Sequence, residues 1–149
     1  MARYHIISVL KRAKNDPLLL AADDYINRLN HYRPSQFHVV KPSNIKEEEE
    51  NILALLPPKG LLVALDERGK ELTSLALSQK CARWELDGYN DLTFVIGGAF
   101  GLGKEITEKA NFVWSLGQLT LPHRLALVTL SEQLYRAQTI LRHEPYHHE

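Results

Sequence analysis

Residues 91–103, DLTFVIGGAFGLG, carry the strongest structural signal in this chain. The apolar, β-rich run at 92–96 predicts a buried strand that stops at the pair Gly97 and Gly98. Glycines at the end of a strand let the backbone come very close to whatever lies beyond it. In open α/β sheets, ligands bind outside the carboxyl ends of the strands. We therefore predict that this turn binds a ligand.

Two phosphate-binding motifs resemble this turn without matching it. The dinucleotide pattern needs a third glycine, and the residues after Gly103 are lysine, glutamate and isoleucine. The stretch 98–104 fits G-x-x-x-x-G-K, but Glu105 follows where a magnesium-binding Ser or Thr is required. A P-loop-like nucleotide hydrolase therefore remains an alternative. A turn that grips a neutral or cationic nucleoside through backbone groups needs neither the lysine nor the hydroxyl.

Outward from this turn, strand and helix patterns alternate along the chain with short connections. This alternation predicts an α/β fold with a mostly parallel sheet flanked by helices. Apolar runs predict strands at 4–10, 37–40, 61–65, 92–96 and 112–116. Helical spacing predicts helices at 17–29, 45–56, 73–86, 104–110 and 121–141. The length favours one domain over residues 1–149.

Capping residues refine these helix boundaries. Asp16 before Pro17 is typical of a helix start, and Ser43 or Asn44 is expected to cap the second helix. We interpret the acidic run at 47–50 as a solvated face, with the sign that suits a helix N-terminus. Thr120 is expected to cap the last helix, with Pro122 inside its first turn.

The last helix carries two apolar stripes. One stripe continues along its whole length, through Leu127, Leu130, Leu134, Ala137 and Leu141. The other runs from Leu121 through Leu125 to Val128 and then turns polar. A single sheet needs only one stripe, so the second favours burial against a partner subunit. The pattern therefore predicts a homodimer.

The composition is that of an ordinary globular protein without an overall charge. Lys and Arg total 18, as do Asp and Glu, which gives no global electrostatic footprint for nucleic acid. The single Cys81 excludes an internal disulfide, and no spacing among the histidines indicates a metal site. No apolar run has the length of a membrane span or of a signal-peptide core, so a cytoplasmic protein is expected, without a membrane partner.

Residues 115–123, SLGQLTLPH, join the last strand to the last helix. Gly117 frees this loop to turn its N–H and C=O groups toward a ligand. The bends at Gly97–Gly98 and at Gly117 are expected to form two walls of one pocket. Residues 65–70, LDERGK, offer a third wall.

Together, four motifs give a resemblance that spans nearly the whole chain. LDERGK, FVIGGAFGLG, SLGQLTLPHRLALVTLSEQLYRA and the terminal HEPYHHE, in this order and spacing, resemble the SPOUT-class methyltransferases of the large ribosomal subunit. Those enzymes use S-adenosylmethionine to methylate N3 of a pseudouridine in 23S rRNA. The resemblance implies a C-terminal deep trefoil knot, a rare exception among folds. It also implies a homodimer whose active sites draw on both subunits.

The resemblance places the family's functional positions on residues of this chain. The cofactor positions fall on Leu65, Gly98, Gly117, Gln118, Leu119, Thr120, Leu121 and Pro122. The matching C-terminal tails reach the partner's cofactor site, which implies catalytic roles for Tyr146 and His147. Arg136 lies one turn after Glu132, and the sequence leaves open whether it forms a surface ion pair or faces the methyl acceptor.

The favoured hypothesis is a methyltransferase in which Arg136, Tyr146 and His147 face the acceptor. The group that removes the N3 proton stays unassigned. Without an RNA-binding domain or net positive charge, weak affinity for free RNA is expected, so the assembled ribosome is the expected substrate. A dimeric nucleotide-binding module without catalysis is a second alternative.

Overall fold

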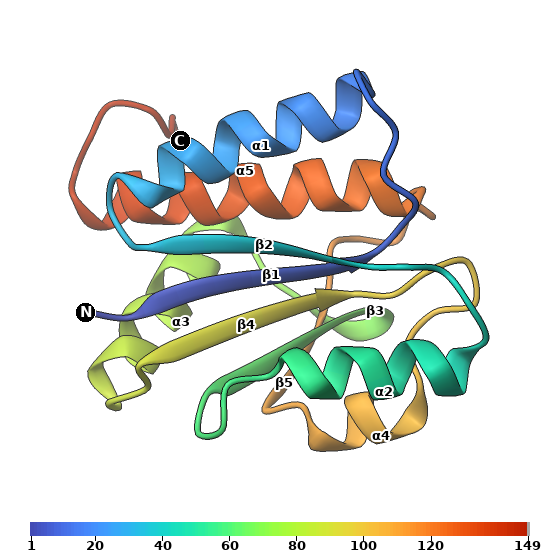
Figure 1. The fold of residues 1–149 in the computed structure, drawn as a ribbon. Coiled ribbons are helices and arrows are strands. Elements are labelled where there is room, and N and C mark those ends of the chain that lie inside the picture. The colour runs from blue at the N-terminus through green and yellow to red at the C-terminus, as the bar shows by residue number, and fades with distance from the viewer. Residues whose placement is uncertain (149) are drawn as a thin grey trace.

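The computed structural model describes residues 1–148, and its centre is a fully parallel β-sheet (Figure 1). The strand order is β2-β1-β4-β3-β5, and each neighbouring pair is parallel. The strands are β1 (Arg3–Val9), β2 (Ser35–Val40), β3 (Leu61–Glu71), β4 (Asp91–Ile96) and β5 (Phe112–Ser115). The predicted α/β class with a parallel sheet is confirmed.

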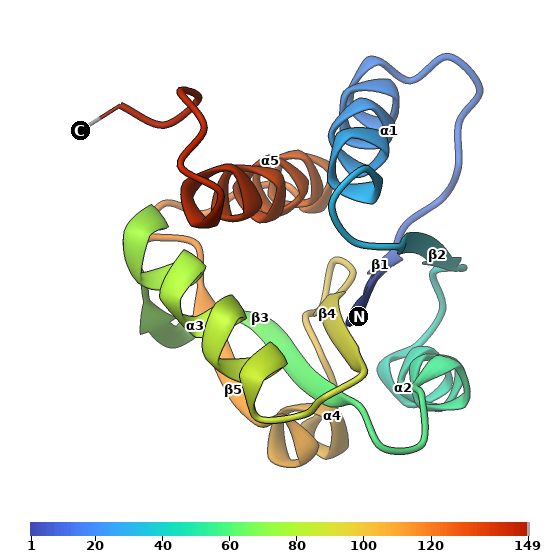
Figure 2. The same cartoon turned by 90° about the vertical axis from the view of Figure 1, so that its left-hand side faces the viewer.

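Helices cover both faces of this sheet (Figures 1 and 2). They are α1 (Pro17–Asn30), α2 (Ile45–Leu55), α3 (Ser74–Leu86), α4 (Lys104–Lys109) and α5 (His123–Leu141). The larger core joins one sheet face to α1, α3 and α5, and the smaller core joins the other face to α2 and α4. Cys81 is fully buried in the larger core, which explains it as a structural thiol.

Side chains cap the starts of three helices. Asp16 accepts from the backbone N–H groups of Leu18 and Leu19, as the sequence predicts. Thr73, expected as the first helical residue, instead caps α3 by accepting from the N–H of Ala76. Asn44, and not Ser43, caps α2. Each cap satisfies donors that a first helical turn leaves without partners.

The last helix begins later than expected. Thr120 does not cap it, and Pro122 is the N-cap residue, without a side-chain hydrogen bond, instead of lying inside the first turn. The prediction of a helix from residue 121 is therefore wrong by two residues. Pro122 has extended backbone angles, and residues 119–122 line a pocket instead of entering the helix.

The strand β3 is longer than its apolar core predicts. Residues 66–71 are polar, yet they continue the strand, because the register shifts after Leu65 and Lys70 pairs again with Trp114 of β5. The same Trp114 also pairs with Leu65, so the intervening residues bulge away from the ladder. This bulge carries Asp66 and Arg68 to the carboxyl edge of the sheet.

Among residues 1–148, no helix is both long and apolar enough to cross a membrane. The final residue of the predicted domain and of the terminal motif, Glu149, lies outside the described residues.

Candidate functional site

The principal pocket lies at the carboxyl edge of the sheet. It has a volume of about 490 Å³, which is in the range of small-molecule sites. Three segments line it: residues 65–68, residues 96–102 except Phe100, and residues 114–123 except Gln118. The structure thus brings the two glycine-bearing bends and the third wall around one cavity.

The wall after β4 is a tight backbone turn. Gly101 N–H donates to the carbonyl of Gly98 at 3.0 Å, and the two residues form an isolated antiparallel bridge. Gly97 lies very close to the backbone of Gly101 across this turn. A Cβ at Gly97 would lie 2.6 Å from the carbonyl carbon of Gly101, closer than real Cβ atoms approach backbone. The turn therefore requires glycine at position 97.

The wall after β5 is held by the Ser115 hydroxyl, which bonds the backbone of Gly117. Gly117 N–H donates to Ser115 Oγ at 3.2 Å, and that hydroxyl lies 3.0 Å from the Gly117 carbonyl. Gly117 has a φ of +145°, a conformation that favours glycine. This bend starts the loop whose later residues line the pocket.

Charged and titratable groups at the pocket suit a positively charged ligand. Arg68 donates two side-chain hydrogen bonds to Asp66, at 3.1 and 3.0 Å, and these bonds lower the pKa of Asp66. Burial lowers the pKa of His123, so its imidazole is neutral at neutral pH. Together with Glu67, the lining holds two carboxylates against the one guanidinium of Arg68, so its formal charge is negative and attracts a cation.

Most of the residues predicted for the cofactor lie together in this pocket. Leu65, Gly98, Gly117, Leu119, Thr120, Leu121 and Pro122 all line it. Gln118 is exposed and is not among the lining residues.

A second cluster gathers the residues predicted for catalysis. Arg136 donates to both carboxylate oxygens of Glu132, most closely from Nη2 at 2.7 Å, and its Nη1 lies 3.0 Å from His147 Nδ1. Tyr146 donates its hydroxyl to Glu132 at 2.6 Å, and its ring lies 4.7 Å from the Arg136 guanidinium. Arg136 and Glu132 thus form an ion pair, and this pair also binds Tyr146 and His147 of the C-terminal tail.

The pocket and this cluster lie at opposite ends of α5. His123 at the first turn lines the pocket, whereas Arg136 lies thirteen residues further along the helix. At 1.5 Å per residue, that separation is about 20 Å. Within one copy of the chain, the predicted catalytic residues therefore do not reach the predicted cofactor residues.

Two glutamates of the acidic run bind backbone groups, which its interpretation as a solvated face did not predict. Glu48 is buried, and its Oε2 accepts from the backbone N–H of Ser43 at 2.7 Å. Glu49 Oε2 accepts from the N–H groups of Glu105 and Ile106 at 2.9 and 3.3 Å. It thereby caps α4, whose own N-cap residue, Gly103, has no side chain. The sequence signal for a cap from a distant residue was the absence of a capping side chain directly before residue 104.

Moving this cap tests its role. We expect Glu49→Ala to destabilise the protein by about 1 kcal/mol, because α4 loses its acceptor. Gly103→Ser alone should cost little stability, because the Glu49 carboxylate that its Cβ would overlap is the far end of a flexible side chain and can turn into solvent while the serine caps α4. Combined, Glu49→Ala and Gly103→Ser should restore stability, because serine supplies a local cap. Urea unfolding measures all three, with Glu50→Ala as the exposed control; additive losses in the double variant would contradict the assignment.

Comparison with known proteins gives consistent results. Residues 2–147 match the protein family described as "Predicted SPOUT methyltransferase". "Ribosomal RNA large subunit methyltransferase H" of Polynucleobacter asymbioticus is 43% identical over 135 residues, which cover 90% of this chain and 91% of the relative. The protein of the same name from Bradyrhizobium diazoefficiens is 39% identical over 149 residues, covering 91% and 93% of the two chains.

Solved structures share the fold at low sequence identity. A probable methyltransferase from Bordetella pertussis Tohama I superposes with a TM-score of 0.58 at 14% identity, covering 92% of this chain and 96% of the other. A putative methyltransferase from Legionella pneumophila, solved with bound SAM, gives a TM-score of 0.51 at 12% identity, covering 91% and 66%.

Proposed function

The chain belongs to the SPOUT methyltransferase family, and we propose that it methylates N3 of a pseudouridine in 23S rRNA, using S-adenosylmethionine. The names of its relatives support an rRNA substrate in the large ribosomal subunit. The observation that carries the proposal is the pocket itself, in which three backbone bends converge at the carboxyl edge of the sheet. The assembled ribosome is the proposed substrate, which places the reaction in the cytoplasm.

The pocket fits S-adenosylmethionine in size and in charge. Leu65 offers an apolar surface for the adenine ring, and backbone groups of residues 117–122 are available for its polar edge. The lining holds one more carboxylate than guanidinium groups, and His123 is neutral, so the pocket favours a sulfonium over a phosphate. When bound, this cofactor supplies a methyl group that an incoming nucleophile can displace.

The acceptor N3 must lose its proton as its new bond to the methyl carbon forms. As the proton leaves, negative charge develops on the imide and is shared with its carbonyl oxygens. Arg136 keeps its positive charge, because hydrogen bonds to Glu132 raise its pKa. A fixed cation at this position stabilises the imide anion. The residue that takes the proton stays open.

His147 contacts the guanidinium of Arg136. A guanidinium carries only donors, so His147 Nδ1 accepts from Arg136 Nη1. We propose that His147 faces the acceptor base beside this guanidinium. The hydroxyl of Tyr146 is held by Glu132, and burial together with this hydrogen bond raises its pKa and keeps it protonated.

We also propose a homodimer in which one protomer's Arg136, Tyr146 and His147 complete the pocket of its partner. The separation of the pocket from Arg136 along α5 supports this proposal. Methyl transfer requires the acceptor base and the cofactor to touch, so the residues that face each of them must lie in one site. Exposed apolar side chains on α1 and α5, among them Leu20 and Leu125, offer surface for a two-fold contact. Membership of the SPOUT family supports the further proposal of a C-terminal trefoil knot.

Mixing two inactive variants tests the shared site. Arg136→Ala leaves the pocket intact, and Gly97→Ala leaves the tail intact. In a dimer with one copy of each, one of the two sites is complete if the site draws on both subunits. We expect re-equilibrated mixtures to recover about one quarter of wild-type activity, since half of the dimers are mixed. Mixtures as inactive as the separate variants would contradict the shared site.

Two measurements test the chemistry. Calorimetry should show binding of S-adenosylmethionine and none of ATP or GTP, which separates this function from a P-loop-like hydrolase. Ribosomes from a strain lacking the enzyme should accept radiolabelled methyl groups at a single pseudouridine, whereas naked 23S rRNA should accept few. Donor binding without incorporation would favour the non-catalytic nucleotide-binding module.

A further inference from the structure

The C-terminal tail is folded back on α5 and does not extend away from it. His143 adopts a left-handed conformation with a φ of +57°, which reverses the chain direction directly after the helix. The backbone N–H of Glu144 then donates to Thr139 at 3.0 Å, and that of Tyr146 donates to Glu144 at 2.9 Å. This reversal brings Tyr146 and His147 back to Arg136, which lies in the last third of α5.

Side chains at the end of α1 hold this reversed segment. Tyr32 donates its hydroxyl to Glu144 Oε2 at 2.6 Å. The guanidinium of Arg142 lies 4.6 Å from the centre of the Tyr32 ring. Arg142 is the C-cap residue of α5. The hydrogen bond to Glu144 raises the pKa of Tyr32 to about 12, so the hydroxyl remains a donor throughout the physiological range. One tyrosine therefore contacts the tail on both sides of its turn.

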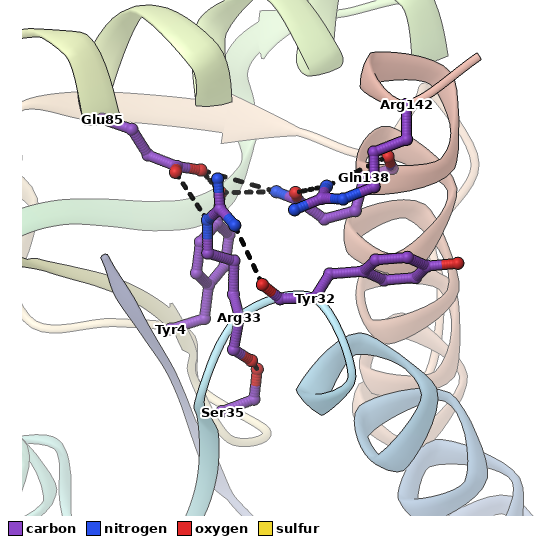
Figure 3. A network of polar contacts seen from close by, with 7 residues as sticks. All are labelled: Tyr4, Tyr32, Arg33, Ser35, Glu85, Gln138 and Arg142. Atoms are coloured by element: carbon purple, nitrogen blue, oxygen red, sulfur yellow. Dashed lines mark hydrogen bonds and ion pairs between the residues drawn. The ribbon is translucent and has the colours of Figure 1, made fainter. Parts of the chain in front are cut away.

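A buried polar network anchors the other side of Arg142 (Figure 3). Arg142 donates to the side-chain carbonyl of Gln138, whose Nε2 donates to the Tyr4 hydroxyl at 3.0 Å. Tyr4 in turn donates to Glu85 at 2.7 Å, and Arg33 donates to the second oxygen of the same carboxylate, also at 2.7 Å. Tyr4 and Gln138 are fully buried. The network ties the last turn of α5 to β1, to α3 and to the turn after α1.

We propose that Tyr32, Arg142 and Glu144 are positioning residues that hold Tyr146 and His147 on the pair of Arg136 and Glu132 before the acceptor arrives. This inference rests on the proposed function, in which the tail takes part in methyl transfer. Chain termini fray unless something ties them down. Ordering a frayed tail costs conformational entropy. If the tail is already ordered in the free enzyme, the transition state does not carry this cost.

Three variants separate the hydrogen bond from the stacked ring. Tyr32→Phe removes the hydroxyl and keeps the ring under Arg142, and Glu144→Gln removes the charge of the acceptor. Tyr32→Ala removes both contacts. The matched control is Glu108→Gln, because Glu108 is also an exposed carboxylate but lies on α4, where it pairs with Lys104. Amide hydrogen exchange of residues 140–148 reports the order of the tail without any substrate.

We expect exchange at the Glu144 amide to become roughly three- to tenfold faster in Tyr32→Phe and in Glu144→Gln. The double variant should exchange no faster than Tyr32→Phe, because that variant already removes the bond that Glu144→Gln weakens. In Tyr32→Ala, kcat on ribosomes should fall about tenfold, with an unchanged KM for S-adenosylmethionine. Glu108→Gln should leave every value at that of the wild type.

Two results would overturn the inference. Unchanged exchange in all three variants would show that these contacts do not order the tail. Faster exchange in Tyr32→Ala with wild-type kcat would show that tail order does not matter for transfer. A wild-type protein that methylates no ribosome would instead refute the proposed function, and the exchange data would still decide whether the contacts order the tail.

Discussion

Arg136→Ala is expected to lower kcat for ribosome methylation by about 10²–10³-fold, the usual loss when one donor to a developing anion is removed. The affinity for S-adenosylmethionine should stay close to wild type, because Arg136 does not line the pocket. Single-turnover methylation and calorimetry measure the two quantities separately. A large loss of donor affinity with an unchanged rate of transfer would contradict the assigned role.

The loss in Arg136→Ala has two physical sources. The cation itself disappears, and Tyr146 loses the guanidinium that lies over its ring. Arg136→Lys keeps the charge but cannot reproduce the paired bonds to Glu132. We therefore expect the lysine variant to recover part of the rate. Arg83→Ala removes an arginine from an exposed pair with Asp87 on α3 and serves as the control, with unchanged activity.

Deletion of residues 146–149 separates these contributions further. It removes Tyr146 and His147 and leaves the ion pair of Arg136 and Glu132 in place. If Tyr146 and His147 face the acceptor base, this deletion should lower the rate of transfer at least as much as Arg136→Ala does. Wild-type turnover in the deleted protein would exclude any part of the tail from the reaction.

The sequence was sufficient where the structural cause is local. Strand alternation, helical spacing and the caps at Asp16 and Asn44 depend on neighbours within a few residues, and all are found in the structure. The glycine bends were also recognisable, because a glycine pair directly after an apolar strand is typical of a close approach between backbone segments. The convergence of these bends followed from a general property of parallel sheets, whose carboxyl ends meet at one edge.

The features that were missed depend on contacts between distant segments. Glu49 acts on α4, more than fifty residues away in the sequence, and nothing near it predicts that partner. Thr120 has the right chemistry for a cap, but its segment lines the pocket instead. The polar half of β3 forms a strand only because β5 accepts it after a register shift. In each case the tertiary arrangement overrides the local pattern.

Gly97→Ala is expected to lower the affinity for S-adenosylmethionine by at least about 100-fold, or about 2.7 kcal/mol. The added methyl would meet the Gly101 carbonyl carbon at 2.6 Å and its oxygen at 2.7 Å. Both are backbone atoms, so the clash cannot be relieved by turning a side chain. The bend must open, and it is one of the walls of the pocket.

Neighbouring glycines provide graded controls for this effect. At Gly98, an added Cβ would meet Val9 Cγ1 at 3.0 Å, and that side chain can shift, so Gly98→Ala should cost affinity about tenfold or less. Gly88 has a φ of +95° with nothing within 4 Å, and it lies outside the pocket. Gly88→Ala should therefore lower stability by about 1 kcal/mol with unchanged affinity. Equal losses of affinity in all three variants would mean that general destabilisation, and not the shape of the bend, controls donor binding.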